Sequence, residues 1–314
     1  MNRYNRRTNM PVKTKALLMN LGAVLCWSFV PLAVRFLSSY YPALFQALFR
    51  YLAALIVLWS FTVSTVGPKR LESDLPRLLC LWPKILVIAL ANYGFQLTFT
   101  LSLYLLLPGL ATLVHQSLVL FSVLLAALLF PDERSMLKIA LFVIGVATAI
   151  IGVIMTIVGS RSFGTFEFNL GVFVVLASAL FWALLGALIR KWLGGVSTSF
   201  TLSSVLTIVS LLFFLTYLFT YRGLPVPRAP AAVWAFLALS GLIGLGIGHS
   251  LYYRAVPVLG IALSSSMALL IPLLVGVASF FLFRERLTWV QLVGGSGLLI
   301  GCYLVIRARF RYME

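Results

Sequence analysis

Residues 109–134 read GLATLVHQSLVLFSVLLAALLFPDER: a small-residue start, a long apolar run and a charged exit. The second half of the chain repeats this order, because residues 260–286 read GIALSSSMALLIPLLVGVASFFLFRER. The two exit acids, Glu133 and Glu285, lie 152 positions apart in a chain of 314 residues. Self-similarity at a fixed spacing indicates a repeated structural unit. The sequence therefore predicts an internal duplication, with one such helix in each half.

The composition identifies lipid as the main surroundings of this chain. Hydrophobic residues make up 62% of it, charged residues make up 10%, and the mean hydropathy is +1.07. A soluble domain carries about 25% charged residues. The net charge of +17 is typical either of a nucleic-acid-binding protein or of a membrane protein with basic loops. We favour the second class, because basic residues flank the apolar runs. All the acids lie outside those runs: Glu72, Asp74, Asp132, Glu133, Glu167, Glu285 and Glu314.

A basic N-terminal tail is followed by a series of apolar runs, each long enough to cross about 30 Å of hydrocarbon at about 1.5 Å per residue. We interpret the first run as a helix and not as a signal peptide, because it is long and lacks a small-x-small cleavage pattern. The sequence therefore predicts an all-α integral membrane protein with ten transmembrane helices. We expect them at residues 16–37, 43–65, 84–104, 109–130, 137–158, 170–191, 198–220, 231–253, 258–283 and 287–306.

The distribution of Lys and Arg predicts the orientation in the membrane. With the N-terminus inside, seventeen of the 24 basic residues fall on the inner side and five on the outer side, while Arg35 and Arg50 fall within helices. Basic loops are retained in the cytoplasm. We therefore expect a multi-pass protein of the cell membrane (inner or plasma membrane) with both termini cytoplasmic.

Further matches support the duplication. Trp27 precedes Arg35 by eight residues, and Trp182 precedes Arg190 by the same eight residues, 155 positions later. Each half holds five predicted helices. Because five is an odd number, the two halves are expected to insert with opposite orientation. Inverted repeats of this kind give many transporters two structures that exchange roles during alternating access.

This order of features resembles the EamA-like branch of the drug/metabolite transporter superfamily. The resemblance implies two EamA-like repeats, residues 1–158 with helices one to five and residues 159–314 with helices six to ten. It also implies membrane transport by alternating access. Two positions depart from the family's pattern. Leu120 stands where the second half has Pro272, whereas the family often has proline in both halves, and Pro131-Asp132 precedes Glu133 where a Gly is more usual. The residues that carry the resemblance are Trp27, Pro42, Arg50, Glu133, Trp182, Pro272 and Glu285.

Arg50 and His115 are ionisable side chains within apolar runs, which makes them candidates for function. Arg50 is either a cation that attracts a carboxylate or phosphate in a central cavity, or an arginine that is satisfied by backbone carbonyls or reaches outward to the interface. His115 either titrates near neutral pH and couples transport to protons, or is a neutral histidine hydrogen-bonded between helices.

Polar and aromatic residues complete the predicted substrate site. Asn92 and Gln96 share a helix face, and a polar face at membrane depth either lines a cavity or bonds another helix. Trp27 and Trp182 occupy equivalent positions and are expected on opposite cavity walls. The residues Ser264–Ser266 either line the inner vestibule or bond the backbone. The candidate substrate-binding residues are Trp27, Arg50, Asn92, Tyr93, Gln96, His115, Trp182 and Tyr252.

Other residues have a structural interpretation. Glu133 and Glu285 are each expected to cap the helix that follows. Small residues four positions apart allow helix backbones to approach closely. Close helix contacts are therefore predicted at Gly244-x-x-x-Gly248 and Gly297-x-x-x-Gly301.

The sequence favours a transporter, with export as its direction, of small organic metabolites such as amino acids. Since Arg50 lies at membrane depth and no carboxylate does, anionic or zwitterionic substrates are expected. The alternatives are a nucleotide-sugar or other organic-anion carrier and, in another class, a membrane-embedded lipid-processing enzyme. A lipid-processing enzyme would need a nucleophile and a base close together inside the membrane. The sequence shows no such pair, so we expect no enzymatic activity. The expected partners are a small-molecule substrate and the lipid bilayer, with no nucleic acid, cofactor or metal; a homodimer is left open.

Overall fold

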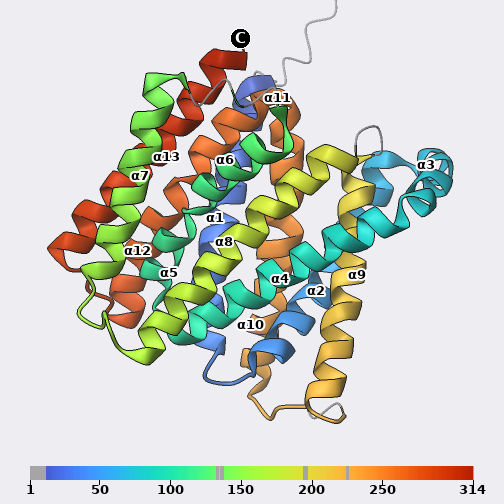
Figure 1. Ribbon diagram of the computed structural model, residues 1–314. Helices are drawn as coiled ribbons and strands as arrows, with labels where there is room; N and C mark the ends of the chain where they lie inside the picture. Colours follow the sequence, from blue (N-terminus) through green and yellow to red (C-terminus); the bar gives the residue numbers. More distant parts are fainter. Residues whose placement is uncertain (1–11, 132–133, 135–137, 194–196, 224–225, 314) are drawn as a thin grey trace, which may run out of the picture.

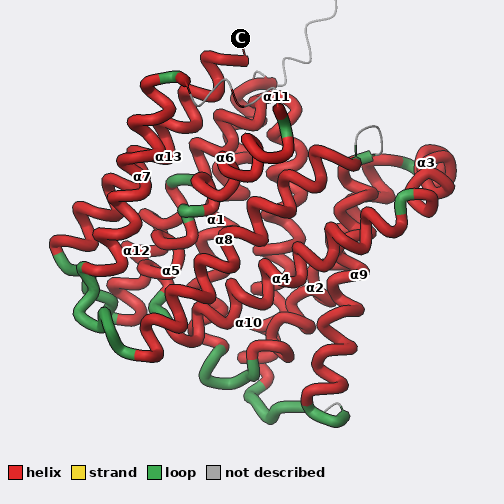
Figure 2. The backbone as a smooth tube through the Cα atoms, viewed as in Figure 1, coloured by secondary structure: helices red, strands yellow, loops and turns green. Residues whose placement is uncertain are grey.

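The computed structural model describes residues 12–131, 134, 138–193, 197–223 and 226–313. These residues form helices joined by short loops, and no strand occurs among them (Figure 2). Helices α1 and α13 respectively begin and end at the same end of the bundle (Figure 1). The elements are α1 (Val12–Leu37), α2 (Ala43–Val66), α3 (Pro68–Cys80), α4 (Trp82–Leu105), α5 (Pro108–His115), α6 (Leu118–Leu129), α7 (Ala140–Val158), α8 (Phe166–Trp192), α9 (Thr198–Thr220), α10 (Ala231–Gly241), the π-helical turn η2 (Leu242–Ile247), α11 (Gly248–Ala268), α12 (Leu270–Phe283) and α13 (Trp289–Met313).

Ten segments of the described chain are helical, long and apolar enough to cross a membrane, which confirms the predicted all-α fold and number of spans. The eighth and ninth spans differ most from the expected bounds. The eighth runs on to Leu259 and the ninth begins at Leu263, so that both lie partly in α11. The connection between the second and third spans is also more regular than a loop, because it forms α3.

Several spans are irregular. α1 contains Pro31, which removes one backbone hydrogen bond from the helix. The eighth span includes the π-helical turn η2. The fourth span is interrupted at Gln116–Ser117, between α5 and α6, and the ninth at Leu269, between α11 and α12. Ser117 and Leu269 are separated by 152 positions, the same spacing as the two exit acids. The interruption thus recurs in both halves, although only the second half has a nearby proline, Pro272.

The most extensive helix packing joins the first half of the chain to the second. α7 packs along α13, α4 along α8, α1 along α11 and α2 along α9. In the α7–α13 pair, a Cβ on Gly145 would lie 2.9 Å from the backbone nitrogen of Val305, and one on Gly152 or Gly301 would overlap backbone atoms of the facing helix. This confirms the close contact predicted for the second glycine spacing.

The first glycine spacing also marks a close contact. A Cβ on Gly248 would lie 3.0 Å from the Trp27 ring, and a Cβ on Gly244 would overlap the side chain of Val30. Both partners belong to α1. One turn earlier, a Cβ on Gly241 would overlap the backbone of Arg50 in α2. The glycines therefore allow the eighth span to lie directly against α1 and α2.

A basic side chain, Arg35, stabilises the C-terminal end of α4, just before the link to α5. Arg35, in the last turn of α1, donates from Nη1 to the carbonyl oxygens of Leu103 at 3.1 Å and Tyr104 at 3.0 Å. These carbonyls belong to the last turn of α4, where no intrahelical donor follows. A cation at a helix C-terminus also interacts favourably with the helix dipole. Arg35 therefore caps α4 from a neighbouring helix.

An acidic side chain, Glu285, stabilises the N-terminal end of α5, just after the same link. Glu285 accepts hydrogen bonds from the backbone N–H groups of Gly109 and Leu110, at 2.8 Å each, in the first turn of α5. The prediction that Glu285 caps the following helix was wrong, because α13 has its own capping box of Thr288 and Gln291. The residue before α5 supplies no side-chain cap, and the carboxylate takes that place. We call Arg35 and Glu285 the α4–α5 clasp; Glu133 lies outside the described residues.

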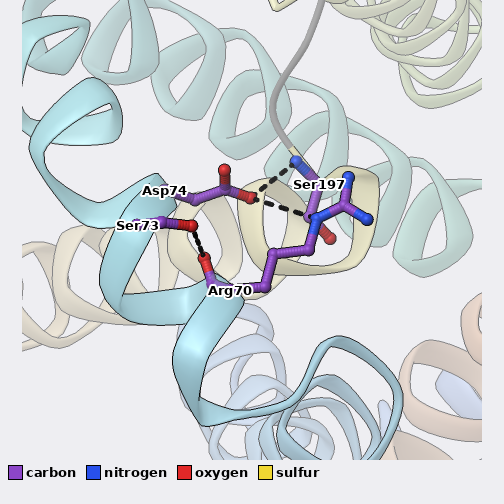
Figure 3. Close-up of polar contacts among 4 residues, drawn as sticks. All are labelled: Arg70, Ser73, Asp74 and Ser197. Atoms are coloured by element: carbon purple, nitrogen blue, oxygen red, sulfur yellow. Dashed lines mark hydrogen bonds and ion pairs between the residues drawn. The ribbon is translucent and has the colours of Figure 1, made fainter.

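Helix α3 projects beside the spans (Figure 1) and is tied to α9. The carboxylate of Asp74 accepts a hydrogen bond from the backbone N–H of Ser197, just before α9, at 3.3 Å (Figure 3). It also lies 4.0 Å from the guanidinium of Arg70. Because the Arg70 side chain is 68% exposed, this ion pair adds little stability. The bond to Ser197 is the contact that joins the two helices here.

Candidate functional site

The helix interruptions surround a cavity of about 200 Å³. Its wall includes an irregular position from each affected helix: Pro31, Gln116, Gly244 and Leu269. Discontinuous helices and π-helical turns are common at binding sites. The aromatic and polar wall residues come from both halves of the chain, namely Trp27, Phe95, Gln96, Phe99, Thr112, His115, Gln116, Trp182, His249, Tyr252 and Ser265.

One wall of the cavity is an aromatic cluster between α1 and α11, which we call the Trp27 cluster. The Trp27 ring lies 5.4 Å from the His249 ring and 5.0 Å from the Tyr252 ring, between centroids. The indole Nε1–H donates to Nδ1 of His249 at 3.4 Å. Gly248 makes room for the indole, as described above. The cluster therefore places three aromatic side chains from opposite halves against one another at the cavity.

A second aromatic cluster joins α8 to α4 and α5, and we call it the Trp182 cluster. The Trp182 ring lies 4.7 Å from that of Phe95. The His115 ring lies 5.7 Å from Phe95 and 4.9 Å from Phe99. Aromatic pairs at these separations interact favourably beyond simple burial. Trp27 and Trp182 thus each belong to a cluster of rings in the cavity wall that includes a histidine. Each cluster contains residues from both halves of the chain.

The cavity wall is mainly apolar, and its polar side chains are uncharged. No Asp, Glu, Lys or Arg of the described chain lines it. The buried Nε2 atom of His115 has no hydrogen-bond partner among the described residues. Because buried polar atoms are nearly always paired with protein, water or ligand, this atom is a candidate contact for a water or a bound molecule. Amide and hydroxyl groups of Gln96, Thr112 and Ser265 add further donors and acceptors.

Arg50 lies outside the lining of this cavity. Its side chain is 2% exposed, and its Nε and Nη2 atoms have no hydrogen-bond partner among the described residues. Oε1 of Gln46, one helical turn earlier on α2, is also buried without a partner. An uncompensated guanidinium is costly to bury. The structure therefore separates Arg50 from the aromatic clusters and leaves two of its nitrogen atoms without a partner among the described residues.

Asn92 and Tyr93 connect helices. Oδ1 of Asn92 accepts a hydrogen bond from the hydroxyl of Tyr51 on α2 at 3.0 Å. The hydroxyl of Tyr93 donates to Oγ1 of Thr216 on α9 at 2.8 Å. Neither residue lines the cavity, whereas Gln96, on the same helix α4, does. Of the candidate residues, the structure thus gathers Trp27, Gln96, His115, Trp182 and Tyr252 at the cavity.

Some wall residues were absent from the sequence-based candidates. His249 was not among them, although its position three residues before Tyr252 puts both on one helix face. Thr112 lies three residues before His115 and four before Gln116, and these spacings also place residues on one helix face. Ser265 lies within the serine stretch considered for a vestibule, and it does line the cavity. Within the described ranges, no cluster of His, Cys, Asp or Glu could hold a metal ion.

Comparisons with known proteins agree with this architecture. The sequence profile of the EamA-like transporter family matches residues 169–307. An "Uncharacterized transporter" of Haemophilus influenzae is 24% identical over 189 residues, which are 60% of this chain and 62% of that protein. A solved protein, described only as "Crystal structure of protein", has a TM-score of 0.66 at 19% identity and covers 95% of this chain and 99% of its own. At that identity the structural likeness shows the fold alone.

The matched family is one of membrane transporters and not of enzymes. The ten candidate spans identify a multi-pass membrane protein. The profile match lies in the second half of the chain, where it covers most of the helices from α8 to α13. By this match the second half of the chain is similar to the EamA-like transporter family.

Proposed function

We propose that this protein exports small organic metabolites, with amino acids as the first candidates, through alternating access around the central cavity. The observation that carries the proposal is the cavity itself, which lies where helices of both halves are interrupted. It also contains a histidine nitrogen that has no hydrogen-bond partner in the described part of the chain. In membrane proteins, irregular backbone at depth is tolerated where it lines a cavity or is buried in protein. A movement of the helices in either half of the chain would therefore change the shape of a binding site at this place.

The packing between halves supports alternating access. The most extensive contacts each pair a helix from residues 1–158 with one from residues 159–314. The Trp27 cluster uses α1 and α11, while the Trp182 cluster uses α8 and α4. An inverted repeat, which stays a prediction, would produce such reciprocal pairs. Rocking of one set of pairs against the other would then move access from one side of the membrane to the other.

The chemistry of the wall favours a substrate class. Aromatic rings on two sides suit an apolar or aromatic body, and neutral amides and hydroxyls suit a zwitterionic or uncharged polar end. A nucleotide sugar carries phosphates, which proteins usually hold with Arg or Lys. Since no described cation lines the cavity, and its volume is about 200 Å³, a small amino acid fits better than a nucleotide sugar.

An organic-anion carrier is the second candidate, and Arg50 favours it. Its buried Nε and Nη2 atoms are free to donate, and no described acid pairs with it. In a conformation that brings α2 to the cavity, the guanidinium would bind a carboxylate in a bidentate manner. Such a role would assign Arg50 to substrate recognition in one state of the transport cycle only.

Ligand-induced thermal stabilisation of the purified protein tests the substrate class. A ligand at 100 times its dissociation constant adds about 2.7 kcal/mol to native-state stability. We expect stabilisation by amino acids, with loss of the effect in Trp27→Ala and in the milder Gln96→Ala, and efflux of the same compounds from loaded proteoliposomes. Stabilisation by nucleotide sugars that requires Arg50 would instead favour the second candidate. Efflux equal to that of protein-free liposomes would refute transport of the compounds tested.

A further inference from the structure

A second hollow lies on the flank of the bundle between α12 and α13, apart from the central cavity. It is a groove of about 600 Å³. Figure 1 places α12 and α13 beside α7 at one edge of the molecule. The apolar walls of the groove include Pro272, Leu273, Val277 and Phe281 of α12 and Leu292 and Leu299 of α13.

The groove is open to the membrane and has the length of one leaflet. Leu273, Val277 and Phe281 are 52%, 63% and 70% exposed. From Pro272 to the end of α12 at Phe283 the helix rises about 16 Å at about 1.5 Å per residue. Half of a hydrocarbon core is about 15 Å. The groove therefore matches the depth to which one acyl chain reaches.

Two glycines in the lining of the groove, Gly276 and Gly295, leave space there because they have no side chain. A Cβ on Gly276 would meet no heavy atom within 4 Å, so this position faces open space. The atoms nearest to a Cβ on Gly295 would belong to the side chain of Leu113, the first of them at 3.2 Å. Leu113 belongs to α5 and forms the floor of the groove. On its other side, the same helix presents Thr112 and His115 to the central cavity.

The charges at one end of the groove suit an anion. Glu285 lines this end, but its carboxylate already accepts hydrogen bonds from the first turn of α5. Arg286 is exposed, lines the same end and has no ion-pair partner in the described chain. Trp289 is 81% exposed just beyond it, and tryptophan is enriched where membrane meets water. A cation and an aromatic residue at headgroup level, above an apolar groove, match the two parts of a phospholipid.

We propose that this groove binds an anionic phospholipid, with one acyl chain between α12 and α13 and its phosphate on Arg286. Arginine binds phosphate through several donors at once. Because Leu113 forms the floor, the bound chain supports α5 from the side opposite the central cavity. The lipid would therefore stabilise the conformation in which α5 completes the cavity wall. This site is independent of the substrate proposed above.

The experiment uses the full chain, purified in detergent, and measures retained lipid by native mass spectrometry together with the thermal unfolding temperature. Phosphatidylglycerol is compared with diacylglycerol, which lacks the phosphate, and with glycerol phosphate, which lacks the chains. Gly276→Leu fills the groove, and Arg286→Gln removes the cation. Matched controls are Gly186→Leu, at another helical glycine whose Cβ would meet open space, and Arg161→Gln, at an exposed arginine outside the groove.

We expect phosphatidylglycerol to be retained and to raise the unfolding temperature of the wild type and both controls. Gly276→Leu and Arg286→Gln should each weaken retention about tenfold, which corresponds to losing one good contact. Equal retention by Gly276→Leu and Gly186→Leu would overturn the groove as the site. Equal effects of diacylglycerol and phosphatidylglycerol would overturn the role of Arg286, and an equal effect of glycerol phosphate would show a free phosphate site instead of a lipid site.

Discussion

Removing the carboxylate of Glu285 from the α4–α5 clasp should destabilise the protein more than removing the carboxylate of any exposed acid. Glu285 is 6% exposed and accepts hydrogen bonds from Gly109 and Leu110, which are themselves buried, as well as from the hydroxyl of Ser279. In Glu285→Ala the two backbone donors lose their acceptor in a place that water reaches poorly. In Glu285→Gln one carbonyl oxygen remains, and it can pair with one of the two donors.

The expected magnitudes follow from these contacts. A hydrogen bond to a charged group contributes about 1.5–3 kcal/mol, and an anion at a helix N-terminus about 0.3–2 kcal/mol. Two such bonds give a loss of about 3–6 kcal/mol for Glu285→Ala. The amide of Glu285→Gln keeps one bond and loses the other together with the charge, so its loss is about 1.5–3 kcal/mol. At about 2–4 °C per kcal/mol, the alanine variant should unfold at least about 6 °C below the wild type.

Thermal unfolding in detergent measures both variants, with Glu72→Ala, at an exposed acid of α3, as the control. Ser279→Ala completes a double-mutant cycle with Glu285→Ala. Both changes remove parts of one hydrogen-bond network. The double variant should therefore lose less stability than the sum of the losses in the two single variants. The reasoning is refuted if Glu285→Ala unfolds at the same temperature as Glu72→Ala, or if the cycle is strictly additive.

Three further predictions concern other contacts. Gly152→Ala should destabilise strongly, because its Cβ would overlap the backbone of α13, whereas Gly276→Ala should be nearly neutral; equal unfolding temperatures would contradict this. Arg50→Met should raise stability by about 1–3 kcal/mol, since it removes a buried charge that has no acid partner among the described residues and two unpaired nitrogen atoms; a lower unfolding temperature would show that the guanidinium is paired. Asp74→Ala should lose about 0.5–2 kcal/mol of capping and increase hydrogen exchange at the start of α9, after Ser197; unchanged exchange there would contradict the tie between α3 and α9.

The number and approximate positions of the spans could be predicted from the sequence, because the hydrocarbon thickness sets the length of an apolar run. The repeated tryptophans were also informative. Trp27 and Trp182 stand at equivalent positions of the predicted halves, and the structure places both in the cavity wall. The glycine spacings succeeded for a similar reason, since only close backbone contact makes the absence of a side chain useful at Gly244 and Gly301.

The assignment of polar residues to faces was harder. In a membrane protein, lipid-facing and core-facing residues are both apolar, so hydropathy does not show which side of a helix faces a cavity. Asn92 and Gln96 share a face by spacing, yet one bonds Tyr51 and the other lines the cavity. The π-helical turn η2 adds a further uncertainty, because it rotates the residues after it, including His249, relative to a regular helix.

The role of Glu285 depended on a contact across 176 positions of the chain. From sequence alone, an acid at a helix exit is expected to cap the nearest following helix. Thr288 and Gln291 already do so for α13, which leaves the carboxylate free for α5. A local rule thus predicted the chemistry of Glu285, helix capping, and missed the partner, because the partner is set by the packing of α12 against α5.

The most direct test of the central claim compares two residues of the same helix. Gln96 lines the cavity, whereas Tyr93, three positions earlier on α4, bonds Thr216 instead. Efflux from proteoliposomes should be measured for wild type, Gln96→Ala and Tyr93→Phe, with the unfolding temperature of each variant alongside. If the cavity is the substrate site, Gln96→Ala weakens substrate binding and slows efflux at unchanged stability, and Tyr93→Phe transports normally. Normal efflux by Gln96→Ala, with loss of efflux in Tyr93→Phe at unchanged stability, would contradict the account.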